Sequence, residues 1–299
     1  MKVLLFDVDS KIPNLALMKL SAYHKARGDQ AGFDISTPDI VYASVVFKKN
    51  RHLTDGLKFI YPNADIRLGG SGNDLKLALP DEIEFIKPDY TLYPDQSYSM
   101  GFTTRGCIRN CHFCIVPEKE GNLKIWQHPS EFHDWRFDTI MLLDNNWLAD
   151  QEWFFQTSGW IRSQNLKVIE GGMDYRLLDE GLALRLSMLK WAKPMHFAFD
   201  HDRDQQAVTD GITLLKKVGV NVRQNVLTYV YLHDSSDKAI ESAKARCRYL
   251  KELGTTPFLM FNIDNTPSKA VKQLRRWANR PWLFWTIDID DYDPKKEHS

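Results

Sequence analysis

Three cysteines lie close together in residues 106–114, at the spacing C-x3-C-x2-C. Cys107, Cys111 and Cys114 therefore place three thiols on one short loop, which suits an iron–sulfur cluster held by cysteine thiolates. A [4Fe–4S] cluster has four irons to ligate, and this loop supplies three ligands. The spacing predicts a cluster with one iron left open to a substrate or a cofactor.

The same cysteines could instead hold a structural zinc ion, with His112 or His128 as the fourth ligand. Zinc sites usually combine two closely spaced ligand pairs, such as two C-x2-C motifs. Here the only other cysteine, Cys247, is far away in the sequence. His112 lies between two of the cysteines, which is a poor position from which to complete a tetrahedron. The spacing favours the cluster and leaves a non-catalytic zinc-binding protein as an alternative.

The composition is that of an ordinary globular protein. Of 299 residues, 43% are hydrophobic and 26% charged, and Lys+Arg and Asp+Glu both total 39. No overall charge therefore attracts the chain to nucleic acid or to a membrane. We expect no membrane span, because no long apolar run occurs, and no secretory signal or disulfide framework. These features predict a cytoplasmic protein.

Residues 1–95 have the pattern of a small Rossmann-like α/β domain. Apolar runs predict strands at 2–8, 39–46 and 64–68, and helical spacing predicts a helix over 14–26. Glycines at 69–72 predict a turn, although such a turn can also let a phosphate approach the backbone. The proline, acidic and tyrosine residues of 80–97 predict a linker or covering segment.

Residues 96–299 alternate strand and helix patterns, which predicts a parallel sheet of the α/β class. Six such units predict a partial (β/α)6 barrel, in which ligands gather at the carboxyl ends of the strands. The cysteine loop follows the first of these strands. The expected strands span 98–105, 139–143, 167–170, 196–200, 221–231 and 257–263, and the expected helices span 150–162, 177–190, 202–217, 236–253 and 268–279.

With the cysteine loop after a first strand, residues from about 98 to 280 resemble the core of the radical S-adenosylmethionine (radical SAM) superfamily. The resemblance implies that Cys107, Cys111 and Cys114 bind a single [4Fe–4S] cluster whose open iron binds S-adenosylmethionine. It implies an enzyme that cleaves this cofactor to a 5′-deoxyadenosyl radical, which abstracts hydrogen from a substrate that the sequence does not identify. Phe113 matches the family's aromatic residue near the adenine.

The resemblance also implies polar contacts to S-adenosylmethionine at the strand ends. The family usually has a Gly-Gly-Glu-like motif after the second strand, and this chain departs from it. The structural alternative for these residues is a turn or a helix cap. The residues expected to contact the ammonium group are Asp144, Asn145 and Asn146, and those expected near the ribose and the carboxylate are Asp174, Arg176 and Asp200.

The N-terminal domain is loosely similar to a shortened cobalamin-binding-type domain, so a cobalamin-dependent radical SAM methylase is an alternative. The D-x-H-x-x-G ligand motif is missing, which argues against cobalamin. The radical SAM resemblance implies an electron donor such as a flavodoxin or a ferredoxin. A nucleic-acid substrate has one feature in its favour, a basic and aromatic stretch that also fits a solvated helix face: Lys269, Lys272, Arg275, Arg276 and Arg280, with Trp277 and Trp282.

Overall fold

The computed structural model describes residues 1–262 and 265–295, which divide into two compact units. The first unit contains Met1–Gly106 and Ile115–Met141, and the second contains Cys107–Cys114 and the chain from Leu142 onward. The cysteine loop thus groups with the C-terminal part of the chain and not with the segments that flank it. The predicted domain boundary after residue 95 stays a prediction.

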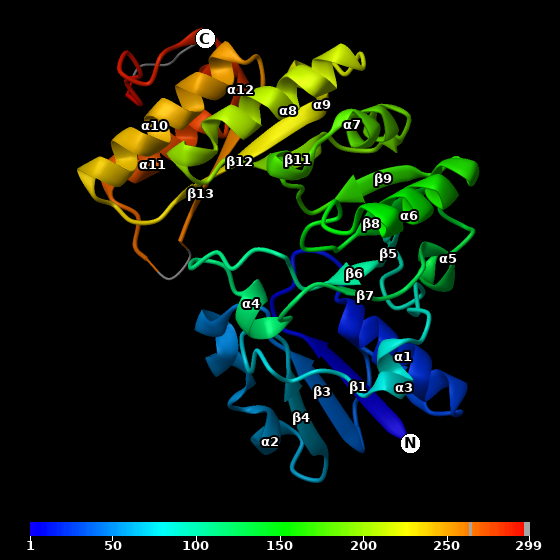
Figure 1. The fold of residues 1–299 in the computed structure, drawn as a ribbon. Coiled ribbons are helices and arrows are strands. Elements are labelled where there is room, and N and C mark those ends of the chain that lie inside the picture. Colours follow the sequence, from blue (N-terminus) through cyan, green and yellow to red (C-terminus); the bar gives the residue numbers. More distant parts are fainter. Residues whose placement is uncertain (263–264, 296–299) are drawn as a thin grey trace. The chain divides into compact units, whose positions relative to one another are not determined.

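The first unit is built on a parallel sheet with the strand order β2-β1-β3-β4, and Figure 1 labels β1, β3 and β4. Its core gathers apolar residues of three segments around β3, where Val41 and Ala43 are buried against Leu4. The predicted elements of this sheet are confirmed within two residues at each end. They are β1 (Lys2–Asp7), α1 (Leu15–Ala26), β2 (Gln30–Gly32, not predicted), β3 (Ile40–Ser44) and β4 (Asp65–Gly69).

The glycine turn after β4 packs against its own chain. Gly70 has a φ of +87°, and a Cβ atom there would lie 2.3 Å from the carbonyl oxygen of Val45. At Gly72 a Cβ atom would lie 2.7 Å from the carbonyl carbon of Phe47. Backbone therefore occupies the space that a phosphate would need beside these two glycines, and the turn interpretation accounts for them.

The segment over 80–97 is anchored on α1 and contains a short helix, α3 (Asp81–Glu84), so it covers the unit rather than merely linking two parts. The buried Lys19 ammonium of α1 lies 2.9 Å from Glu84 Oε1. Asp89 accepts hydrogen bonds from Ser21 Oγ and Lys25 Nζ, each at 2.6 Å. A buried ion pair resists separation, because either partner alone would be an uncompensated charge.

Asp89 should make the stability of the first unit depend on pH. Burial raises the pKa of Asp89, but hydrogen bonds from Lys25, Ser21 and Thr91 outweigh it and lower the pKa from 3.8 to about 2. The folded state then binds the proton less readily than the unfolded state, so stability falls as the pH drops from about 4 to 2. Above pH 5, ionised Asp89 should make the free energy of unfolding of wild type about 2 kcal/mol larger than that of Asp89→Asn. This difference should shrink below pH 4. Urea unfolding at several pH values measures this; a constant difference down to pH 2 would contradict it.

The rest of the first unit consists of short elements. The predicted strand over 98–105 is wrong as one element, because it is divided at Gly101 into two strands. A Cβ atom at Gly101 would lie 2.6 Å from the ring of Phe132, so close packing with this ring requires the glycine. The elements are η1 (Lys48–Thr54), α2 (Leu57–Ile60), β5 (Ser99–Gly101), β6 (Thr104–Arg105), α4 (Val116–Lys119), β7 (Lys124–Ile125), α5 (Pro129–Phe132) and β8 (Thr139–Leu142), which ends in the second unit.

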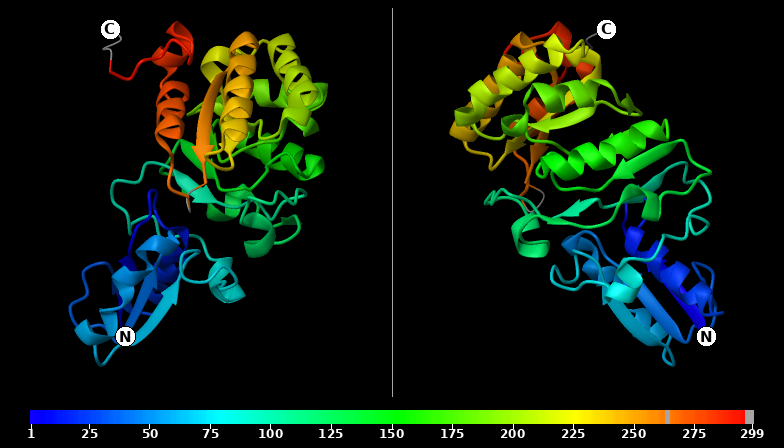
Figure 2. Two further views of the ribbon diagram at one scale, coloured as in Figure 1. Left: turned by 90° about the vertical axis from the view of Figure 1, so that its left-hand side faces the viewer. Right: turned by 45° about the vertical axis from the view of Figure 1, so that its right-hand side comes forward.

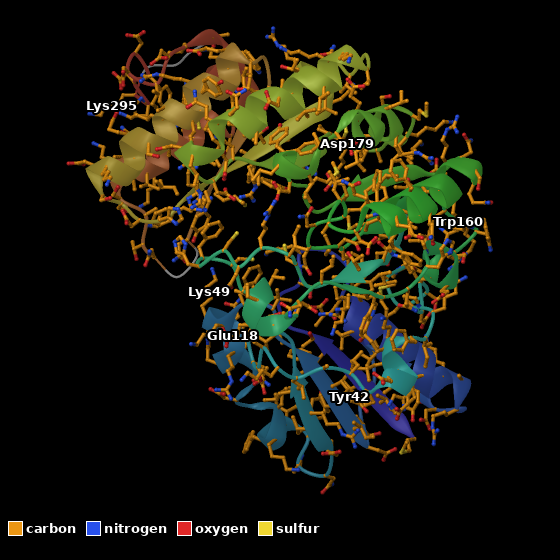
Figure 3. All side chains as sticks on the ribbon, viewed as in Figure 1. Tyr42, Lys49, Glu118, Trp160, Asp179 and Lys295 are labelled. Carbon is orange, nitrogen blue, oxygen red and sulfur yellow. The ribbon has the colours of Figure 1, made fainter. Side chains whose placement is uncertain are left out.

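The second unit alternates strands and helices as predicted. Asp179, labelled in Figure 3, caps α7 by accepting the Leu182 N–H at 2.8 Å. The elements are α6 (Gln151–Ser163), β9 (Lys167–Glu170), η2 (Tyr175–Leu177), α7 (Glu180–Ser187), β10 (Lys190–Trp191), β11 (Met195–Ala198), η3 (Asp202–Asp204), α8 (Gln205–Lys217), α9 (Val222–Asn225), β12 (Val226–Leu232), α10 (Asp237–Glu252), β13 (Thr256–Phe261), α11 (Lys269–Ala278) and α12 (Pro281–Thr286).

Strands β11, β12 and β13 form a parallel sheet in that order, and β9 pairs in parallel with β10. Helices α10 and α11 pack on this three-stranded sheet (Figure 2). Along β12 the side chains alternate, with Thr228 and Val230 buried and Tyr229 and Tyr231 only partly buried. The parallel pairing confirms a mixed α/β protein.

Two predicted elements in this unit have wrong boundaries. The strand expected from residue 221 begins at Val226, because residues 222–225 form the helical turn α9. The helix expected over 177–190 begins at Glu180, where the Asp179 carboxylate caps it, and it ends before β10. The predicted end of the last strand at Ile263 lies outside the described residues.

Candidate functional site

The cysteine loop, residues 107–114, has no helix or strand and leaves its thiols partly accessible. Cys107 and Cys111 are half-buried and Cys114 is exposed, and none forms a disulfide. The Cys114 N–H donates to the carbonyl oxygen of Cys111 at 3.0 Å, and the Arg109 N–H lies 3.4 Å from Cys107 Sγ. The loop backbone therefore turns back on itself between the cysteines.

The Cys111 thiol lies near enough to the other two for their charges to affect its ionisation. Burial raises the pKa of the Cys111 thiol, and the nearby negative charges of Cys114, Asp200 and Cys107 raise it further. No group of three His, Cys, Asp or Glu side chains within residues 1–262 and 265–295 is arranged to hold a metal ion. The donor chemistry nevertheless fits an iron–sulfur cluster, because three thiols close enough to interact lie on one irregular loop.

Asp174 joins the cysteine loop to the segment after β9. Its carboxylate accepts Arg109 Nε at 2.8 Å and Arg176 Nε at 2.7 Å. Burial raises the pKa of Asp174, but the hydrogen bonds from Arg176 and Arg109 outweigh it, so the pKa lies below its usual value. Two guanidinium groups share this one carboxylate, and Arg176, which lies near Cys111, also approaches Asp204 Oδ2 at 3.5 Å. The Arg176 charge lowers the pKa of the Cys111 thiol, but burial and the charges of Cys114, Asp200 and Cys107 outweigh it.

Aromatic and imidazole rings gather at the loop and at the carboxyl ends of β11 and β12. Phe113 stacks on Tyr231 with ring centroids 4.2 Å apart. His112 stacks on His233 at 4.9 Å, and His233 lies 5.8 Å from His201. Burial lowers the pKa of His201 and His233, which favours their neutral forms. Our sequence analysis did not select Tyr231 and His233, although their position at a strand end could have indicated them.

Asp200 and Arg246 hold the ends of β11 and β12 together. Asp200 Oδ1 accepts the Tyr231 N–H at 2.9 Å, and burial raises the Asp200 pKa to about 6. Arg246 comes from α10, and its side chain is only 4% exposed. It donates to the carbonyl oxygens of Phe199 at 2.7 Å and Tyr231 at 3.1 Å. One buried guanidinium thus fixes the two strand ends that carry the rings.

The polar turn after β8 is largely buried. Asp144 and Asn146 are 3% and 4% exposed, and Asp144 and Asn145 both have interaction partners. Asn146 Oδ1 has no hydrogen-bond partner among the described residues. A Cβ atom at Gly171 would lie 3.5 Å from the Asp144 carbonyl oxygen, so this turn approaches the glycines that follow β9. The turn therefore offers an unused acceptor at the carboxyl ends of the strands.

Glu170, His196 and Tyr229 form a second polar group that the sequence analysis did not select. Glu170 Oε1 accepts the His196 N–H at 2.6 Å and lies 3.2 Å from His196 Nδ1. The Glu170 carbonyl oxygen lies 3.1 Å from the same nitrogen, and Tyr229 stacks on the imidazole at 5.2 Å. The other carboxylate oxygen, Glu170 Oε2, is buried without a hydrogen-bond partner among the described residues.

His196 is expected to carry its proton on Nδ1. Both neighbours of Nδ1 are acceptors, so Nδ1 must donate, and neutral His196 then presents Nε2 as an acceptor. Nitrogen-15 correlation spectra near neutral pH should show the Nδ1–H form of His196, with His196→Gln identifying its signals. A predominant Nε2–H form would contradict this assignment.

Comparisons of the sequence add no relatives: no protein-family model matches the chain, and no curated protein matches it. No helix within the described residues is long and apolar enough to cross a membrane.

Proposed function

We propose that the chain is a radical SAM enzyme with a single [4Fe–4S] cluster on Cys107, Cys111 and Cys114. The observation that carries the proposal is the cysteine loop itself. Its C-x3-C-x2-C spacing supplies three ligands and no more, and Cys107 and Cys114 lie near enough to Cys111 for their charges to raise its pKa. The proposal includes a partial (β/α)6 barrel over the C-terminal unit, a cytoplasmic location and an electron donor such as a flavodoxin or a ferredoxin.

Two guanidinium groups lie at the loop. Arg109 and Arg176 both pair with Asp174, and Arg176 also pairs with Asp204, so donors for an anionic ligand are held in place on or near the loop. Arg176 favours the Cys111 thiolate, because an opposite charge nearby favours the ionised form, and it opposes the effects of burial and of the charges of Cys114, Asp200 and Cys107. In this role Asp174 orients the two guanidinium groups instead of contacting the ribose directly.

S-adenosylmethionine could be held by residues of the same unit. Its ammonium group needs acceptors, and the buried oxygens Asn146 Oδ1 and Glu170 Oε2 lack hydrogen-bond partners among the described residues. Phe113 offers a ring for the adenine. When bound, the reduced cluster and S-adenosylmethionine would supply a 5′-deoxyadenosyl radical that takes hydrogen from a substrate. The task of the chain is then to bind, orient and shield.

Anaerobic reconstitution tests the proposal. We expect about four irons per chain and, after reduction, an electron paramagnetic resonance signal that changes when S-adenosylmethionine is added. Release of 5′-deoxyadenosine in the presence of a reductant should accompany this change. Stoichiometric zinc with no bound iron, or a cluster whose signal ignores S-adenosylmethionine, would overturn the proposal; the first result would support the zinc alternative.

A further inference from the structure

Helix α11 presents a basic face that forms no ion pair with the described part of the chain. Residues 265–287 contain no Asp or Glu. The helix buries one face, including Val271, Leu274 and Trp277, against the rest of its unit. The basic side chains lie outside that face and are exposed; they are Lys269, Lys272, Arg275, Arg276 and, just after the helix, Arg280.

The adjacent helix α10 provides a contrast. Three of its five basic residues form ion pairs: Lys244 with Glu241, Arg246 with Asp202, and Arg248 with Asp288 and Asp290. Lys238 and Lys251 form none with the described residues. In contrast, none of the α11 cations forms an ion pair with any residue in the described part of the chain. A chain with no net charge has therefore gathered unpaired positive charge on one helix face.

We propose that α11 and the start of α12 form a nucleic-acid-binding surface. Lys269, Lys272 and Arg276 follow the i, i+3, i+7 spacing of one helix stripe, which is about 10 Å long. A nucleic-acid strand presents a phosphate about every 3.4 Å along its helix axis, so this stripe can meet several phosphates. Trp282, 51% exposed at the start of α12, offers a ring on which a base can stack.

The structure favours a nucleic acid over an anionic membrane as the polyanion. A helix that binds a bilayer inserts its apolar face among the lipids. In α11 that face is already buried, with Val271 and Trp277 fully enclosed. The surface therefore offers charge and an exposed ring, but no apolar face for insertion. This inference goes beyond the proposed function, because binding at α11 needs no cluster.

The test compares two charge-removing variants of the full chain. The first combines Lys269→Gln, Lys272→Gln, Arg275→Gln and Arg276→Gln. The matched control removes the same number of charges from exposed lysines elsewhere in the unit: Lys190→Gln, Lys193→Gln, Lys216→Gln and Lys217→Gln. The probe is a fluorescent single-stranded RNA of about 20 nucleotides, long enough to span the stripe, with DNA of the same sequence in parallel.

Wild type should bind the RNA with an affinity that falls steeply between about 50 and 200 mM salt. The α11 variant should bind the RNA at least about tenfold more weakly. The slope of its log binding constant against log salt concentration should also be shallower, by about 0.7 for each phosphate contact that is lost. The control should change less than about twofold. If DNA binds as tightly as RNA, the surface binds nucleic acids in general. If RNA binds more tightly, the partner is an RNA.

Three results would overturn the inference: no binding by folded wild type at low salt, equal weakening by both variants, or binding only to phosphatidylserine vesicles. Thermal unfolding of each variant verifies that it is folded. The Cys111→Ser variant should bind the RNA as wild type does. That result separates this inference from the proposed function, because a failure of cluster assembly leaves RNA binding intact. Likewise, a loss of RNA binding in the α11 variant should leave cluster assembly intact.

Discussion

Changing Cys111 to Ser should abolish cluster assembly and, with it, reductive cleavage of S-adenosylmethionine. We expect the iron content after reconstitution to fall from about four per chain to well below one. A serine hydroxyl is a much poorer iron ligand than a thiolate, and two remaining cysteines cannot hold a cubane at three of its corners. Release of 5′-deoxyadenosine should fall at least about a hundredfold, which corresponds to a barrier increase of about 2.7 kcal/mol.

Cys247→Ser is the matched control for this change. Cys247 is fully buried in α10, and burial raises the pKa of its thiol to about 12, so it is neither accessible nor a ready thiolate. The control should retain the iron content and the response to S-adenosylmethionine. If Cys111→Ser kept a full complement of iron, or if Cys247→Ser lost it, the assignment of ligands would be wrong.

Replacing Arg246 with Met should destabilise the C-terminal unit. The change removes the donors to the carbonyl oxygens of Phe199 and Tyr231, which are then left at the buried strand ends. Unsatisfied buried acceptors cost about 1–3 kcal/mol each, so we expect a loss of about 2–4 kcal/mol, since water can enter part of the space. Urea unfolding followed by circular dichroism measures it.

Arg248→Met is the comparison, two residues along the same helix. Arg248 pairs with Asp288 and Asp290, all of which are partly exposed, and such surface ion pairs contribute about 0–1 kcal/mol. Similar losses in both variants would show that the hydrogen bonds of Arg246 do not anchor the strand ends. The rings at these ends should also become less ordered in Arg246→Met alone, which near-ultraviolet circular dichroism can detect.

The sequence predicted most of the long elements because their local signals agree. The helix expected over 236–253 is α10, Asp237–Glu252, and its N-cap Ser236 accepts the Ala239 N–H as a helix-starting serine should. The strand over 167–170 is β9 with the same limits. The sequence did not predict short strands such as β2 and β10. Two or three residues are too few to show an alternation of apolar and polar side chains, and only pairing with a neighbouring strand defines them.

In the candidate site, too, some features follow from the sequence and others only from the tertiary structure. The sequence by itself determined the three thiols on one loop, because residue type and spacing are local properties of the chain. Only the tertiary structure decided that Arg109 and Arg176 share Asp174, and that Tyr231 and His233 lie beside Phe113 and His112. Apart from Arg176 and Asp174, which are two residues apart, these partners are far apart in the sequence, and no pattern within one segment records which strand ends meet. The physical reason is that β11 and β12 are brought together by packing and by the buried Arg246, and such long-range contacts form only when the whole unit folds.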